Sequence, residues 1–135
     1  MLMNLAMEFH DSELTSMARR GDSIELRFEA YIHGSEGMPG VDAGKGWYQD
    51  VMLIVGDGSV KGEITSWPAE LYDGTLEIDG TTIKNVIPLP LERNGHIRLT
   101  VKPSFNDEPL VVLGNRVSLE FFPGAPRFIE DFPGT

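Results

Sequence analysis

The chain contains no cysteine among its 135 residues. Disulfides therefore contribute nothing to its stability, and thiol nucleophiles and zinc–thiolate sites are excluded. Absence of thiols suits a reducing compartment, so we expect a cytoplasmic protein. At this length the sequence predicts a single domain with a core large enough to need no covalent staples.

Long hydrophobic runs are also missing. Residues 1–9 are mainly apolar but carry no basic residue, and acidic residues stand at Glu8 and Asp11, which is not the pattern of a signal peptide. No stretch reaches the roughly 18 apolar residues that a membrane-spanning helix requires. The sequence therefore predicts a soluble protein without a membrane partner.

Basic residues are scarce. Eleven lysines and arginines stand against 21 aspartates and glutamates, which gives a net charge of −10. Residues 1–80 hold 15 acidic and 5 basic residues, whereas residues 81–135 hold 6 of each. Such a charge repels phosphate backbones and anionic lipids, which argues against nucleic acid and membrane surfaces as partners. A basic protein partner would be attracted, although the same acidity also serves solubility alone.

Alternation of apolar and polar residues dominates the sequence. Residues 23–33 place every second side chain on one apolar face, which is the period of a half-buried strand. Residues 97–101 and 117–121 repeat this pattern. The strands predicted in this way cover residues 3–9, 14–19, 23–33, 47–55, 59–66, 74–79, 81–87, 96–102, 109–114 and 116–122.

Residue pairs that tolerate positive φ separate these segments and predict tight turns. Asn94-Gly95 is the strongest signal, because Asn-Gly favours the type I′ turn that matches strand twist. Sequential hairpins predict an all-β, mainly antiparallel fold, either a β-sandwich or a partly closed barrel of about nine or ten strands. The other predicted turns are Arg20-Gly21-Asp22, Asp57-Gly58, Asp79-Gly80 and Gly114-Asn115.

Two segments allow more than one prediction. Residues 12–19 also have helical spacing with a polar cap before them, so a two-turn helix is the alternative to a strand. Residues 123–135 contain three prolines, and regular structure is expected to stop near Phe122. The prediction is one β domain, residues 1–122, on which this tail packs through its apolar side chains, Phe128, Ile129 and Phe132, and packing of these side chains on a partner is the alternative.

The longest predicted loop, residues 34–46, contains five glycines. Its sequence GVDAGKG has the glycines and lysine of a phosphate-binding loop, but three residues separate the first glycine from Gly-Lys where the motif needs four. Gly46 follows the lysine in place of serine or threonine, and the next segment is a predicted strand rather than a helix. The loop is therefore interpreted as a flexible connection and not as a nucleotide site.

The sequence EFHDSEL, residues 8–14, contains the residue types of a hydrolytic triad in His10, Asp11 and Ser12. Adjacent side chains on a strand point to opposite faces, so these three do not stack as a triad in regular structure. The favoured interpretation is a structural corner in which Asp11 and Ser12 accept backbone N–H bonds. A binding role for the three residues is the alternative.

Other candidate binding residues are dispersed. His33 meets His10 if their strands pair, but the three histidines have no metal-ligand spacing, so neither a metal nor another cofactor is predicted. Trp47 and Trp67 flank strands beside the glycine-rich loop. Exposed together, they would form a surface for a sugar or a protein. Burial in the core is the favoured interpretation for Trp47, whereas Trp67 stays open because Pro68 marks a strand end.

The stretch EFHDSEL followed by the alternating strand SIELRFEAYIH resembles small uncharacterised bacterial β-rich domains that open with Phe/Trp-His-Asp. Some of these domains look like immunity proteins of bacterial toxin systems. The resemblance covers residues 1–33. It implies a bacterial domain without enzymatic activity, and it marks His10 and Asp11 as the motif residues without assigning them a chemistry.

The sequence thus predicts a non-catalytic binding or interaction domain. Its sharpest form is an immunity-like protein whose acidic half covers a basic partner. One alternative is a small-molecule-binding barrel with residues 34–46 as a lid. Another is an enzyme that uses His10 with Asp11 or His33. The sequence leaves the oligomeric state open.

Overall fold

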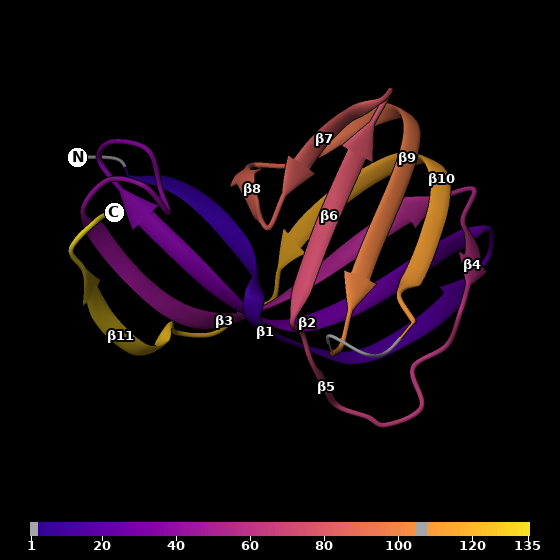
Figure 1. The fold of residues 1–135 in the computed structure, drawn as a ribbon, viewed down its shortest axis with the longest axis horizontal. Helices are drawn as coiled ribbons and strands as arrows, with labels where there is room; N and C mark the ends of the chain where they lie inside the picture. Colours follow the sequence, from indigo (N-terminus) through magenta and orange to yellow (C-terminus); the bar gives the residue numbers. More distant parts are fainter. Residues whose placement is uncertain (1–2, 105–107) are drawn as a thin grey trace.

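A computed structural model describes residues 3–104 and 108–135, and Figure 1 shows its strands. Within these residues the chain forms one antiparallel sheet that curls into a half-barrel and contains no helix, which confirms the predicted all-β class. The strands are β1 (Asn4–Arg20), β2 (Ser23–Ser35), β3 (Gly44–Gly56), β4 (Ser59–Lys61), β5 (Ala69–Glu70), β6 (Asp73–Ile78), β7 (Thr81–Lys84), β8 (Val86–Leu89), β9 (Glu92–Lys102), β10 (Leu110–Phe121) and β11 (Arg127–Phe132).

The three long strands β1, β2 and β3 form the centre of the sheet and run through the whole molecule (Figure 1). A turn at Gly21, with φ of 64°, joins β1 to β2 as predicted. In β2 the alternate residues Ile24, Leu26 and Phe28 are buried, because successive side chains point to opposite faces. Residues 12–19 belong to β1, so the strand prediction is confirmed and the helical alternative is wrong.

The sheet has the order β5-β1-β2-β3-β10-β9-β6-β7, and its curl brings β6 back towards β1. Phe9 of β1 fills the space over Gly74 of β6, where an added Cβ would lie 2.4 Å from the Phe9 ring. Asn85, which lies between β7 and β8, links β1 to β6 by two backbone hydrogen bonds. Its N–H donates to the Gly74 carbonyl of β6, and its carbonyl accepts the Phe9 N–H of β1. The bonds at Asn85 and the close Phe9–Gly74 contact hold the open side of the half-barrel together.

Two predicted turns are wrong. Asn94-Gly95 lies inside β9 and Gly114-Asn115 lies inside β10, where the two strands pair with a register shift. Gly95 has a φ of 142°, so the pair provides a β-bulge that bends two long strands. Residues that tolerate positive φ serve a bulge as well as a turn, and local sequence does not separate the two. Asp57-Gly58 and Asp79-Gly80 do connect consecutive strands.

The loop and tail also differ from prediction. β2 extends to Ser35 and β3 begins at Gly44, so the connection predicted over 34–46 is strand at both ends and is a loop only over residues 36–43. The tail forms β11, which pairs with β3, although regular structure was expected to stop near Phe122. Its backbone packs on the domain, but the side chains of Phe128 and Ile129 remain exposed, against expectation.

Apolar side chains from all the long strands fill the inside of the half-barrel. The largest of them are fully buried, and they include Phe9 and Leu14 from the two ends of the FHDSEL stretch. This burial supplies the main favourable term in folding. The part of the chain that the structure describes has no helix of the length and hydrophobicity needed to cross a membrane.

Candidate functional site

The FHDS stretch forms a wide bulge in β1. Glu8 faces Tyr31 of β2 and Glu13 faces Glu29, so the four residues 9–12 stand opposite Ala30 alone. Asp11 lies at the crest of the bulge with a φ of 74°, a conformation that aspartate tolerates better than most residues. The break predicted between two strands, 3–9 and 14–19, is therefore a bulge within one strand.

Ser12 fixes the inner side of the bulge. Its hydroxyl donates to the Glu8 carbonyl at 2.5 Å and accepts the Tyr31 N–H at 2.8 Å, and the residue is 1% exposed. The hydroxyl thus takes the place of a backbone carbonyl opposite Tyr31, as the structural interpretation expected of Ser12. The same expectation is wrong for Asp11, whose carboxyl accepts no backbone N–H from the described residues. A buried hydroxyl engaged in this way is not free to act as a nucleophile.

Asn85 holds the outer side of the bulge. Beyond the bond from Phe9, its side-chain oxygen accepts the backbone N–H of His10 at 2.8 Å. Asn85 has a φ of 59°, which asparagine adopts readily. Sequence reasoning missed this residue, since a lone asparagine between two short strands gives no signal beyond a turn.

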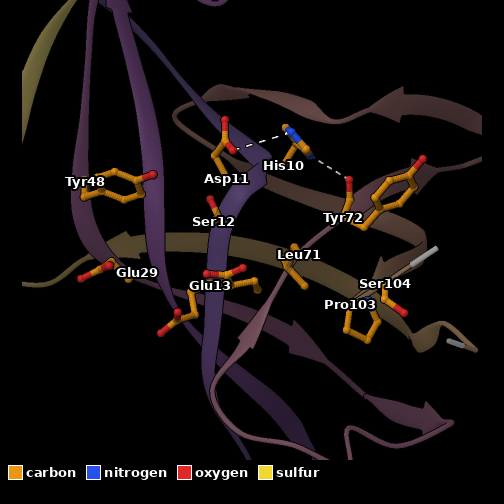
Figure 2. Close-up of a pocket in the computed structure, with 11 residues that line it drawn as sticks. His10, Asp11, Ser12, Glu13, Glu29, Tyr48, Leu71, Tyr72, Pro103 and Ser104 are labelled. Carbon is orange, nitrogen blue, oxygen red and sulfur yellow. Dashed lines mark hydrogen bonds and ion pairs between the residues drawn. The ribbon is translucent and has the colours of Figure 1, made fainter. Parts of the chain in front are cut away.

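The His10 ring is fixed by the chain after β5. Its Nδ1–H donates to the Tyr72 carbonyl at 3.0 Å, and its Nε2 lies 3.6 Å from Asp11 Oδ1 (Figure 2). The Tyr72 carbonyl is the main cause of a raised His10 pKa; partial burial opposes it, and the charge of Asp11 adds to it. The backbone N–H of Leu71 completes the corner by donating to the Ser12 carbonyl.

The Asp11 carboxyl has a raised pKa. Partial burial is the main cause, the nearby His10 opposes it, and the charge and hydrogen bond of Glu8 add to it. Tyr48 of β3 also has a raised pKa, first because of burial and then because of the Asp11 charge. Asp11 and Tyr48 thus share a local field that disfavours further negative charge.

The bulge forms one wall of a cavity of about 470 Å³ (Figure 2). Its other walls come from β2, β3, β5 and the segment after β9. Its lining residues include His10, Tyr48 and Tyr72. The carboxylates that line it are Asp11, Glu13, Glu29 and Glu70, and lysine and arginine are absent from its described lining.

Three of these carboxylates belong to residues in direct register across neighbouring strands, because Glu13 faces Glu29 of β2 as well as Glu70 of β5. Glu13 of β1 is the register partner of Glu70 of β5. In the described part of the chain neither has an ion pair with a basic side chain, whereas Glu29 accepts a hydrogen bond from Arg127 at 2.9 Å. Like charges on directly opposed residues destabilise a sheet.

The sequence-derived candidates fall into two groups. His10, Asp11 and Ser12 meet at the cavity, but His33, Trp47 and Trp67 are not among its lining residues. His33 is 3% exposed and stacks edge-on with Tyr31 and Phe132, and its Nε2 lies 3.4 Å from Glu8 Oε1. Trp47 is half-buried and packs against the core, and Trp67 is 43% exposed.

Sequence reasoning missed several residues of the cavity. Glu29 and Tyr48 have their place there because β1, β2 and β3 pair in a particular register, which is a long-range property. Glu70 and Tyr72 come from a segment with little strand signal. The only local hint was the dense polar cluster of EFHDSEL itself. Among residues 3–104 and 108–135, no group of three histidine or carboxylate side chains is placed to hold a metal ion.

Comparisons of the chain with protein-family models, with curated proteins and with solved structures found no match.

Proposed function

We propose that the chain is a non-catalytic binding domain whose cavity receives a cationic side chain, lysine or arginine, from a basic protein partner. The observation that carries this proposal is the opposed pair Glu13 and Glu70, which lacks a neutralising basic side chain in the described structure. A bound cation between the two carboxylates would relieve the repulsion that the sheet register imposes. An immunity-like protein that covers a basic toxin is the sharpest form of this function.

The size and the aromatic lining of the cavity support the same ligand. A volume of about 470 Å³ admits a long side chain with its hydration, but not a folded element. The aromatic side chain of Tyr48 would offer a site for the stem and the charged head of such a side chain. The net charge of −10 would speed the capture of a basic protein by electrostatic steering.

The alternatives are less favoured. An enzyme that uses His10 and Asp11 lacks a nucleophile beside them, because the Ser12 hydroxyl is buried and occupied by backbone groups. His33 lies outside the cavity. A small-molecule barrel needs space inside the half-barrel, where tightly buried apolar side chains pack together instead.

A titration with acetyl-argininamide tests the proposal, because this probe carries one guanidinium and no other charge. Followed by NMR, it should shift the backbone amides of Glu13, Glu70 and Tyr72. Acetyl-citrullinamide has nearly the same shape without the charge and should leave them unmoved. The Glu13→Gln/Glu70→Gln variant should weaken acetyl-argininamide binding by about tenfold or more, as expected when charged contacts are removed.

Glu120→Gln is the matched control, because Glu120 is an exposed carboxylate on β10 outside the cavity lining. It should leave the affinity unchanged. Equal shifts with the arginine and citrulline probes, or equal weakening by the two sets of variants, would sink the proposal.

A further inference from the structure

Two of the most exposed large apolar side chains of the described structure are adjacent on β11. Phe128 is 79% exposed and Ile129 is 62% exposed. Arg127 pairs with Tyr48 and Glu130 pairs with Gly46, so residues 128 and 129 form a bulge against a single residue of β3. Phe128 has a φ of 54°, which is rare for a bulky aromatic residue. We call this pair the β11 crest.

Both flanks of the crest are anchored to the body. On one side the Arg127 guanidinium donates to Glu29 and to Asp50, each at 2.9 Å. On the other side Glu130 accepts the hydroxyl proton of Tyr31 at 2.5 Å. Beyond it Asp131 pairs with Lys45, and Phe132 stacks edge-on against the buried His33 with ring centroids 4.9 Å apart. The crest is thus held in place on both sides and is not the end of a frayed strand.

Because both flanks are anchored, Phe128 and Ile129 are held in fixed, exposed positions. A strained backbone conformation persists only where the surroundings fix it, and such positions gather at binding surfaces. The anchors of β11 hold two large apolar side chains outward in a defined geometry. Rigid apolar groups lose little conformational entropy on binding, which makes them efficient centres of an interface.

The crest is continuous with the acidic cavity. The ring of Phe128 lies 6.4 Å from that of Tyr48, which lines the cavity. Glu29 also lines the cavity and accepts a hydrogen bond from Arg127, the residue before the crest. The two features therefore share Tyr48 and Glu29 and lie on one side of β2 and β3.

We infer that the β11 crest and the acidic cavity form a single interface for a basic protein partner that carries an apolar recess beside its cationic side chain. This inference rests on the proposed function, since it takes the same partner. The apolar crest would enter the recess, and the carboxylates around it, including Glu130 and Asp131, would face the basic rim. Apolar centres with complementary charged rims are the usual anatomy of specific interfaces.

A second copy of this chain fits the crest poorly. Two chains of net charge −10 repel each other, whereas a basic partner is attracted. The positive φ of Phe128 also interrupts β11 near its start, and a bulged edge resists continuous pairing with an identical strand. Charge complementarity therefore selects the basic partner.

Two nine-residue peptides with arginine at the same alternate positions test the inference. One has leucine at the remaining positions and the other has serine. By isothermal titration calorimetry the leucine peptide should bind the wild-type chain about tenfold more tightly than the serine peptide. The variant Phe128→Asn/Ile129→Thr should remove this advantage and leave the serine peptide unaffected. Asparagine suits the positive φ and threonine suits a strand, so both changes should preserve the fold.

Met38→Thr is the matched control, because Met38 is 62% exposed but lies in the loop between β2 and β3 and not on the crest. The Met38→Thr variant should still bind the leucine peptide more tightly than the serine peptide, by the same factor as the wild-type chain. The joint interface is overturned if the wild-type chain shows no leucine advantage, if the crest variant keeps it, or if Met38→Thr removes it equally. In each of these cases the proposed function still stands, provided that the Glu13→Gln/Glu70→Gln variant binds both peptides more weakly than the wild-type chain does. If that variant leaves both affinities unchanged, the proposed function fails and the joint interface fails with it.

Discussion

The hydroxyl oxygen of Ser12 lies 2.8 Å from the backbone nitrogen of Tyr31 on the neighbouring strand. A side chain here takes the place of a backbone carbonyl in the ladder between β1 and β2. The bulge between Glu8 and Glu13 depends on this substitution, because four residues on one strand face one on the other and the ordinary ladder is interrupted. The cavity wall made by His10 and Asp11 therefore depends on this serine hydroxyl as well as on the bonds of Asn85 and Tyr72.

Replacement of Ser12 by alanine should lower the free energy of unfolding by about 2 kcal/mol, because two buried backbone groups, the Tyr31 N–H and the Glu8 carbonyl, lose their partner. Urea denaturation measures the change. Ser16→Ala, on an exposed position of the same strand, is the control and should have little effect. Equal losses in the two variants would show that the hydroxyl does not hold the bulge.

Replacement of Glu13 by glutamine should stabilise the chain by about 0.5 kcal/mol, because it removes the like-charge pair with Glu70 across β1 and β5. The same change should weaken the binding of acetyl-argininamide. A gain in stability that accompanies a loss of binding is the behaviour of a residue kept for function. A variant less stable than the wild-type chain at low salt would contradict the repulsion.

Asp11→Asn should stabilise the protein in a pH-dependent way. The folded chain holds the Asp11 proton to higher pH than the unfolded chain does, because burial raises the pKa from 3.8. The stability that Asp11 contributes is therefore complete below the unfolded pKa and is lost as pH rises through the folded pKa. Asparagine keeps the positive φ and does not ionise. Urea denaturation across this range should show the variant and the wild-type chain diverging as pH rises, and a constant difference would refute the prediction.

The His10 ring should titrate above its ordinary pKa of 6.5, chiefly because its Nδ1–H donates to the Tyr72 carbonyl. Its contribution to stability is complete below 6.5 and is lost as pH rises through the folded pKa. Nitrogen-15 NMR should find the proton of the neutral ring on Nδ1. In Asp11→Asn the pKa should fall only in part, since the carbonyl remains. A neutral ring protonated on Nε2 would exclude the bond to Tyr72.

Phe128→Asn should raise the free energy of unfolding by up to about 1 kcal/mol, because asparagine tolerates the φ of 54° better than phenylalanine. Phe128→Ala removes the same exposed ring without this tolerance and serves as the control. Thermal unfolding should place the asparagine variant above the alanine variant. The reverse order would show that the backbone at the crest is not strained.

Much of the fold was predictable from local pattern. The alternation around Ile24, Leu26 and Phe28 defines β2, and Gly21 marks the turn before it. The errors concern bulges. Gly95 has the positive φ of a turn residue but bends β9, and only the length of the paired strand decides between the two roles. Strand β11 was missed because the prolines around it argue against regular structure, although none lies within it.

The candidate site was predictable only in its first residues. The polar cluster of His10, Asp11 and Ser12 is visible in one dimension, since three such residues between apolar neighbours interrupt a strand pattern. The partners of this cluster cannot be recognised in the sequence. Glu70 and Asn85 come from segments about 60 and 75 residues away and are positioned by the curl of the sheet.

The partner of β3 changes along its length: residues 51–56 lie beside β10, whereas the stretch from Gly44 to Tyr48 lies beside β11. The last strand of the chain therefore shields backbone N–H and C=O groups of a central strand from other molecules. A chain cut after Phe122 would keep its core but present half of β3 as an open template for foreign strands. We expect such a truncated chain to aggregate while the intact chain stays dispersed.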